Sequence, residues 1–136
     1  MKFRILTLLL AFSILGFAQQ KLPLIPMPKN IEYQTEFFIL NSKTVIQIAD
    51  VNSFEALFLK ENIKAQTGLE LKITSKFTAK NAIQLGIKLT DTTNFNKEQY
   101  ELVIDKNKIN IAAFANQGLF YGVQTLLQNI PYENAK

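Results

Sequence analysis

The sequence predicts an α+β domain, a mostly antiparallel or mixed β-sheet with two helices packed on one of its faces. Apolar residues recur with a helical period near residues 53–67 and again near 116–130. Between these segments, apolar and polar residues alternate as in half-buried strands. No internal repeat or low-complexity tract is present. We therefore expect one folded domain over residues 19–130, with 131–136 as the start of a linker.

Residues 1–18 are typical of a cleaved secretory signal peptide. Lys2 and Arg4 precede an apolar run from Ile5 to Ala18, in which Gly16 and Ala18 occupy the small positions that signal peptidase requires. The run is too short for a membrane anchor, because a spanning helix needs about 20 apolar residues. The chain has no cysteine for lipid attachment. We expect an exported protein, periplasmic or extracellular, with no membrane association after cleavage.

Extended segments are predicted before the first helix. Three prolines make residues 21–30 an extended lead-in. The apolar and β-branched stretches at 31–33, 37–40 and 44–49 then predict three short strands.

The first helix is predicted over residues 53–67. Asn52 is its expected N-cap, with Glu55 completing a capping-box-like pair, and Gly68 is the expected stop. Two apolar series recur at near-helical spacing: Phe54, Phe58 and Ala65 in one, and Ala56, Leu59 and Ile63 in the other.

Strands return after this helix. Alternation predicts strands at 70–73, at 83–89, and in a hairpin of 100–104 with 109–113. The hairpin turn is expected at 105–108, with Asn107 suited to a positive φ. Residues 91–98 are polar and predict a surface connection.

The last element is a helix that Asn116 is expected to cap and Pro131 to end. Gly118 and Gly122 lie one turn apart on the same side, so we expect them to let the helix approach a neighbouring backbone closely. Its apolar face consists of Leu119, Val123, Leu126, Leu127 and Ile130.

Missing residue types exclude several kinds of site. The chain has no His, Cys or Trp, which leaves no ordinary zinc site, no Cys–His pair and no Ser–His–Asp triad. Ser42, Ser53 and Ser75 therefore have no imidazole base, and we interpret them as turn or cap residues. No Gly-rich phosphate loop is present.

Carboxylates remain as possible acid–base groups, but no two are adjacent in the sequence. A glycosidase places two acidic groups on either side of the scissile bond, and most of the acids here stand in polar, lysine-containing stretches. We assign no catalytic, cofactor-binding or metal-binding residue. The acids are Glu32, Glu36, Asp50, Glu55, Glu61, Glu70, Asp91, Glu98, Glu101, Asp105 and Glu133.

The charge pattern does not indicate a nucleic-acid partner. Net charge falls from +4 to +2 without Lys2 and Arg4, and Arg4 is the sole arginine. The remaining lysines are dispersed, whereas nucleic-acid binders cluster basic residues with aromatics.

Two stretches carry a family resemblance. One begins with Leu24-Ile25-Pro26-Met27-Pro28 and continues through the strands predicted up to Ile46. The other runs from Tyr100 to Gly118-Leu119-Phe120-Tyr121-Gly122-Val123-Gln124-Thr125-Leu126-Leu127-Gln128. Both resemble the N-terminal domain of family 20 glycoside hydrolases, the β-N-acetylhexosaminidases. Glu36 departs from the family pattern, which often has glycine there, so the local turn stays open.

The resemblance implies a zincin-like fold without zinc, beside a (β/α)8 catalytic barrel of the same polypeptide. In such enzymes the barrel carries an adjacent Asp–Glu pair, and the 2-acetamido group of the substrate attacks its own anomeric carbon. No such pair occurs in this sequence, so the resemblance implies a non-catalytic domain of an enzyme that removes terminal N-acetylglucosamine or N-acetylgalactosamine. It also implies that the face around the second helix stabilises the barrel.

Two alternatives stay open at this point. The domain could belong to another exo-glycosidase, of the O-GlcNAcase-like or α-glucuronidase-like kind. It could also be a stand-alone exported glycan-binding module, although that class often presents exposed Trp and this chain has none. Exposed Tyr121 and Tyr132 on one surface would indicate the face that meets the barrel.

Overall fold

A computed structural model describes residues 24, 27–32, 35–78, 80–88 and 96–131. The predicted signal peptide lies outside the described residues. So do 91–95 of the predicted connection and 132–136 of the predicted linker.

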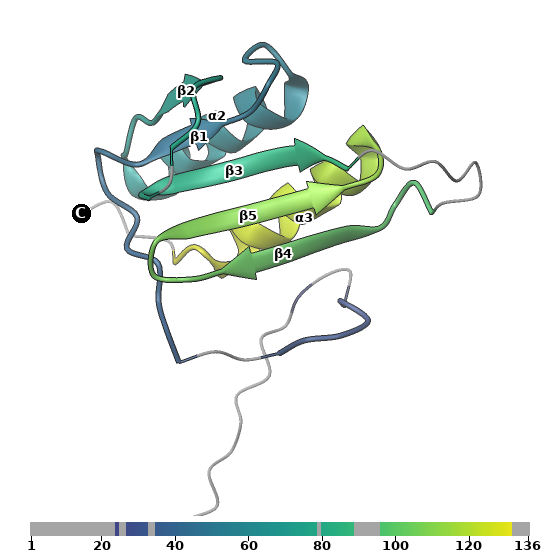
Figure 1. Ribbon diagram of the computed structural model, residues 1–136. Coiled ribbons are helices and arrows are strands. Elements are labelled where there is room, and N and C mark those ends of the chain that lie inside the picture. The colour runs from purple at the N-terminus through teal and green to yellow at the C-terminus, as the bar shows by residue number, and fades with distance from the viewer. Residues whose placement is uncertain (1–23, 25–26, 33–34, 79, 89–95, 132–136) are drawn as a thin grey trace, which may run out of the picture.

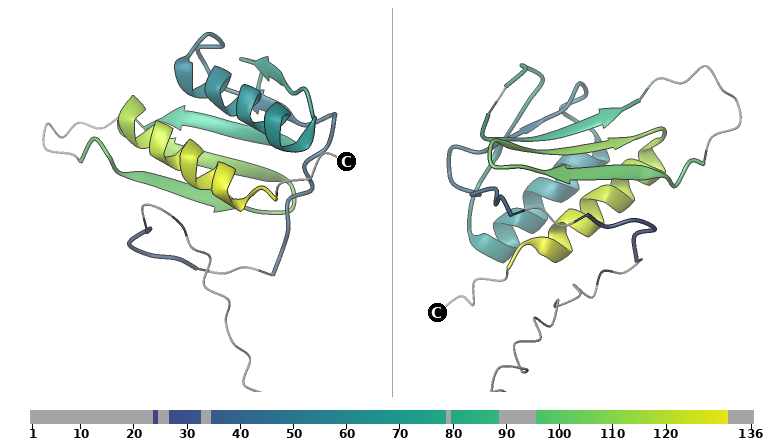
Figure 2. Two further views of the ribbon diagram at one scale, coloured as in Figure 1. Left: turned by 180° about the vertical axis from the view of Figure 1, so that it is seen from behind. Right: turned by 60° about the horizontal axis from the view of Figure 1, so that its bottom comes forward.

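The described chain forms one five-stranded sheet covered by two helices on a single face (Figures 1 and 2). The strand order across the sheet is β2-β1-β3-β5-β4. Helices α2 and α3 run side by side in the same direction across that face (Figure 2). The elements are β1 (Val45–Gln47), α2 (Phe54–Thr67), β2 (Lys72–Thr74), β3 (Ala82–Ile87), β4 (Tyr100–Ile104), β5 (Lys108–Ala113) and α3 (Asn116–Asn129).

The α+β class and the mixed sheet are confirmed. Within the described residues, β1 pairs in parallel with β2 and with β3, and β3 pairs in parallel with β5. Antiparallel pairing joins β4 to β5, so the several antiparallel strands expected after the first helix reduce to that hairpin. The alternation of side chains is the same in both kinds of strand, and it is the helical crossover between β1 and β2 that makes them parallel.

Helix α2 has a different N-cap from the one predicted. Ser53 is the cap, and its hydroxyl accepts a hydrogen bond from the N–H of Ala56 at 3.4 Å. Asn52 instead donates its N–H to the Asp50 carboxylate at 3.0 Å, so the expected pair with Glu55 does not form. The predicted stop is confirmed, since Gly68 has φ 74° and its N–H reaches the Lys64 carbonyl. Serine serves as well as asparagine at this position, and one residue of register decides between them.

The strand predicted at 37–40 is wrong. These residues form no strand pairing; Phe37 and Ile39 are exposed while Phe38 and Leu40 pack against the core. Residues 31 and 32 of another predicted strand are also outside the sheet, and Tyr33 is outside the described residues. An apolar run does not make a strand by itself, because a strand also needs a neighbour with free ladder groups.

The β4–β5 turn is held by a carboxylate rather than by a left-handed residue. Asp105 accepts hydrogen bonds from the N–H groups of Asn107 at 2.6 Å and Lys108 at 3.0 Å. Asn107 was expected to have a positive φ; among described non-glycine residues, that conformation occurs at Asn81 (φ 54°). The side-chain acceptor closes the turn as an Asx-type turn, which removes the need for a left-handed residue.

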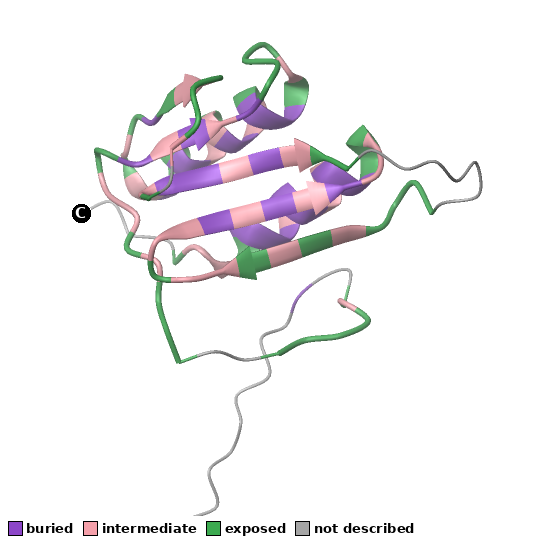
Figure 3. Ribbon diagram, viewed as in Figure 1, coloured by how far each residue is buried: buried purple, intermediate pink, exposed green. Residues whose placement is uncertain are grey.

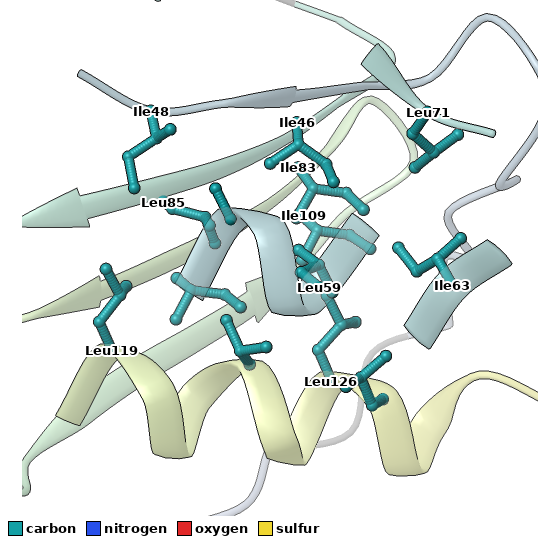
Figure 4. Close-up of a cluster of buried hydrophobic side chains, with 14 of the residues drawn as sticks. Ile46, Ile48, Leu59, Ile63, Leu71, Ile83, Leu85, Ile109, Leu119 and Leu126 are labelled. Atoms are coloured by element: carbon teal, nitrogen blue, oxygen red, sulfur yellow. The ribbon is translucent and has the colours of Figure 1, made fainter. Parts of the chain in front are cut away.

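The core lies between the sheet and the helix pair (Figures 3 and 4). Ile46, Ile83 and Ile111 of the central strands belong to one cluster with Leu59 of α2 and Leu126 of α3, and all five are at most 1% exposed. Branched aliphatic side chains fill this layer, as close packing between a sheet and helices requires.

Candidate interaction surface of the helix pair

Among the described carboxylates, Glu55 is buried on α2 (6% exposed), Glu32 and Glu61 are exposed, and the others contact lysines, turns or an amide. Exposed ion pairs join Lys64 to Glu70 at 3.5 Å, Lys88 to Glu101 at 2.6 Å and Lys106 to Glu36 at 3.0 Å. Asp50 and Asp105 accept backbone N–H groups, and Glu98 accepts the Gln117 amide. Asp91 and Glu133 lie outside the described residues.

The pKa shift that is resolved points away from general-acid chemistry. Backbone hydrogen bonds from Asn107 and Lys108 lower the pKa of Asp105 below its usual value. A glycosidase general acid needs the opposite shift, so that it is protonated near neutral pH. The candidate serines also have structural places: Ser53 caps α2, while Ser42 and Ser75 lie in exposed turns.

The part of the chain that the structure describes lacks two further features. It holds no cluster of three or more His, Cys, Asp or Glu residues able to bind a metal ion. Among the same residues, no helix has both the length and the apolar character needed to cross a membrane.

Two glycines bring α3 against the sheet. A Cβ at Gly118 would meet the carbonyl oxygens of Gln99 and Lys97, and the Gly118 N–H donates to the Lys97 carbonyl at 2.9 Å. A Cβ at Gly122 would meet the side chains of Ile111 and Tyr100. The predicted close backbone approach therefore occurs at Gly118, while Gly122 makes room for side chains.

A partly buried hydrogen bond joins the same helix to β4. The hydroxyls of Tyr100 on β4 and Thr125 on α3 lie 2.7 Å apart, and Thr125 is 2% exposed.

Helix α3 has no side-chain cap at its N-terminus. Ala115 is the N-cap and makes no such hydrogen bond, so Asn116 is the first helical residue and not the cap that was predicted.

An aromatic patch crosses the outer side of the helix pair. It consists of Phe54 and Phe58 of α2 with Phe120 and Tyr121 of α3. The Phe54, Phe58 and Phe120 rings lie 5.2–5.7 Å apart by centroid, and the Tyr121 ring lies 6.3 Å from that of Phe120. Phe54 is 64% exposed although two other rings lie beside it. The patch joins the first turns of two parallel helices into one partly exposed aromatic surface.

The position of this patch was not anticipated from the sequence. Phe54 and Phe58 have the spacing of a helix face, and only the parallel arrangement of α2 and α3 brings Phe120 beside them. Tyr121 is half-buried and its hydroxyl is 3.4 Å from the Gln117 amide, whereas Tyr132 lies outside the described residues. The sequence did contain a signal for the patch, because α2 carries two apolar series. Ala56, Leu59 and Ile63 supply its buried face, which leaves the series of Phe54 and Phe58 over.

Known proteins resemble this chain in sequence or in fold. A β-hexosaminidase of Porphyromonas gingivalis (strain ATCC BAA-308 / W83) is 34% identical over 113 residues, which are 81% of this chain and 14% of that protein. The GH20 β-N-acetylhexosaminidase from Streptomyces coelicolor A3(2) superposes with a TM-score of 0.62 at 28% identity, over 74% of this chain and 20% of that one. The structure of CpGH84D gives a TM-score of 0.64 at 11% identity, over 82% and 22%, and shows a shared fold alone.

The chain thus spans about a seventh of the curated relative and about a fifth of the solved hexosaminidase. The family description "Glycosyl hydrolase family 20, domain 2" matches residues 21–136, which include every described helix and strand. This chain therefore belongs to the family of domain 2 of the family 20 glycosyl hydrolases.

Proposed function

We propose that this chain is the non-catalytic N-terminal domain of an exported β-N-acetylhexosaminidase that removes terminal N-acetylglucosamine or N-acetylgalactosamine from glycans. The observation that carries the proposal is the family match over residues 21–136, combined with two hexosaminidases of which the chain spans only 14% and 20%. Export rests on the signal-like residues 1–18. The catalytic barrel is the proposed partner within the same polypeptide.

The arrangement of the carboxylates supports a non-catalytic role. Glu36, Glu70 and Glu101 pair with lysines on the surface, each on a different part of the sheet or its connections. Hydrolysis by a family 20 enzyme needs a carboxylic acid beside the scissile bond and a second carboxylate to orient the acetamido group. We place both groups outside this domain.

The aromatic patch is the surface we assign to the barrel. Burying a phenylalanine side chain fully contributes roughly 1.5–3 kcal/mol, and Phe54 leaves most of that contribution unused in the described chain. Phe58 and Phe120 are half-buried beside it. A partner that covers the patch therefore buries the remaining exposed area of rings that their neighbours already hold in place. Rings that are preordered lose little conformational entropy on docking.

The decisive assay compares the complete protein with this chain alone. The complete protein is expected to hydrolyse a chromogenic N-acetyl-β-glucosaminide, and residues 19–136 are expected to release no chromophore. Turnover by residues 19–136 would place the catalytic groups inside the domain. Failure of the complete protein on both the glucosaminide and the galactosaminide would contradict the proposed substrate class.

The docking surface is tested separately with Phe54→Ser/Phe120→Ser in the complete protein. We expect the Tm of the complete protein to fall by several degrees, because two rings lose an apolar interface. The control is Phe77→Ser, which removes a more exposed ring (76% exposed, against 64% for Phe54) from the connection between β2 and β3. Equal Tm changes in the two proteins would argue against docking through the patch.

A further inference from the structure

A second surface feature lies at the end of the sheet where β3 and β5 begin. It is a shallow pocket of about 310 Å³, at the small end of the range for ligand pockets. Residues 36–43 run past this end of the sheet, next to the β4–β5 turn (Figure 1). Its lining consists of Phe37, Phe38, Ile39, Asn41, Lys80, Asn81, Lys106 and Asn107.

The polar wall of this pocket is held in place by the fold. The N–H of Asn81 donates to the Asn107 carbonyl at 2.6 Å, and the N–H of Val45 donates to the Asn81 carbonyl at 3.2 Å. Asn81 adopts a left-handed conformation, and its side-chain oxygen accepts the hydroxyl of the buried Thr44 at 2.7 Å. Asn41 is fixed by the N–H of Lys43, which donates to its side-chain oxygen at 2.9 Å. The wall is therefore preorganised, which lowers the entropic cost of binding.

Two polar groups on this wall are available to a ligand. Within the described residues, the side-chain amide of Asn107 and the ammonium of Lys80 make no hydrogen bond or ion pair, whereas Lys106 is paired with Glu36. An amide offers both donors and an acceptor, and an ammonium offers three donors. Among the described residues, no carboxylate belongs to the lining.

The apolar side of the pocket is unusually open. Phe37 is 82% exposed and Ile39 is 76% exposed, although Phe38 between them packs against the core. The extended segment is thus anchored through Phe38 and leaves two large apolar side chains of the pocket lining exposed. A ring presented in this way next to free donors suits a ligand with one apolar face and several polar substituents.

We propose that this pocket is a non-catalytic subsite for an N-acetylhexosamine residue of a glycan. The C–H face of the sugar stacks on Phe37, and the acetamido methyl packs on Ile39. The acetamido carbonyl accepts from Lys80, and a ring hydroxyl exchanges hydrogen bonds with Asn107. The sugar class rests on the proposed function, while the position of the site rests on the pocket itself.

The test uses the complete protein with ¹³C-labelled isoleucine methyl groups and methyl α-N-acetylglucosaminide as probe. A β-specific hydrolase leaves this α-glycoside intact, so binding is read without turnover. The Ile39 methyl signal, assigned with Ile39→Val, is expected to shift saturably. Phe37→Ala is expected to weaken binding about three- to tenfold, and Asn107→Ala about two- to tenfold. The matched control Phe77→Ala, and turnover of the chromogenic β-glucosaminide by Phe37→Ala, are expected to be unchanged.

Four results bear on the pocket in different ways. An Ile39 signal that does not shift overturns the proposal, and so does an equal shift with methyl α-glucoside, which lacks the acetamido group. If Phe37→Ala lowers the Tm of the complete protein more than Phe77→Ala does, Phe37 is covered by another part of the protein and the proposal fails. If the protein lacks hydrolase activity while the Ile39 shift persists, the proposed function fails and the subsite stands.

Discussion

The inner and outer sides of the helix pair carry different kinds of apolar residue. On the inner side, Leu59, Ile63 and Leu126 are at most 1% exposed and pack against the sheet (Figure 4). On the outer side, Phe54 and Phe120 form a surface of aromatic rings. Aliphatic side chains fill the irregular space between sheet and helices, whereas large rings present area to a partner. The difference separates residues that fold the domain from the residues that we propose dock it on the barrel.

The largest expected effect comes from the inner side. Leu59→Ala removes a fully buried side chain between α2 and the sheet and leaves a cavity, so we expect the free energy of unfolding to fall by about 2–5 kcal/mol. Urea unfolding followed by far-ultraviolet circular dichroism measures this change. The control is Leu57→Ala on the same helix, where the leucine is 45% exposed and the loss should be below about 1 kcal/mol. Similar losses at the two positions would erase the distinction between the sides.

A second prediction concerns the glycine contact between α3 and the segment that precedes β4. Gly118→Ala places a methyl group against the carbonyl oxygens of Gln99 and Lys97, and backbone at this point cannot yield as a flexible side chain would. We expect a loss of about 1–3 kcal/mol in the free energy of unfolding. Gly86→Ala is the matched control, because a Cβ there meets nothing within 4 Å. A Gly118 variant as stable as the Gly86 variant would contradict the close approach.

The third prediction isolates a polar contact on the inner side. Tyr100→Phe keeps the ring beside Gly122 but removes the hydroxyl that lies 2.7 Å from Thr125. The expected loss is about 0.5–1.5 kcal/mol, the usual net value of one hydrogen bond. A double-mutant cycle with Thr125→Val measures the coupling of the two hydroxyls directly. Additive losses in the cycle would mean that the two hydroxyls do not interact.

The sequence predicted the positions of the helices and strands better than it predicted which strands pair. The helix predicted at 53–67 begins one residue later, at Phe54, and the strand predicted at 100–104 is the observed β4. Both have signals within a few residues: the Gly68 stop, and the alternation of Tyr100, Leu102 and Ile104. Parallel pairing of β3 with β5 was not predictable in this way, because it requires β4, which lies between them in the sequence, to take the edge of the sheet.

The two proposed surfaces were harder still to predict. Phe54 and Phe37 stand in apolar patterns that predict burial as readily as exposure. Phe54 is exposed because Leu59 and Ile63 already occupy the inner side of α2. Phe37 is exposed in a segment, residues 37–40, with which no described strand pairs. An excess of apolar residues over the available core is visible in a sequence, whereas the particular residues left outside depend on tertiary packing.

The smallest expected effect concerns the β4–β5 turn. Two backbone N–H groups lower the pKa of Asp105, so its ionised form stabilises the folded chain. This contribution is fully present above the unfolded-state pKa and is lost as pH falls through the lower folded-state pKa. The stability difference between the wild type and Asp105→Ala, measured by urea unfolding, should therefore shrink as the pH falls below about 5 and through the lowered pKa of Asp105. Asp105→Asn keeps an acceptor oxygen without a titrating charge, so its difference from Asp105→Ala should stay constant with pH. A wild-type difference that is equally constant would mean that the turn depends on the shape of residue 105 and not on its charge.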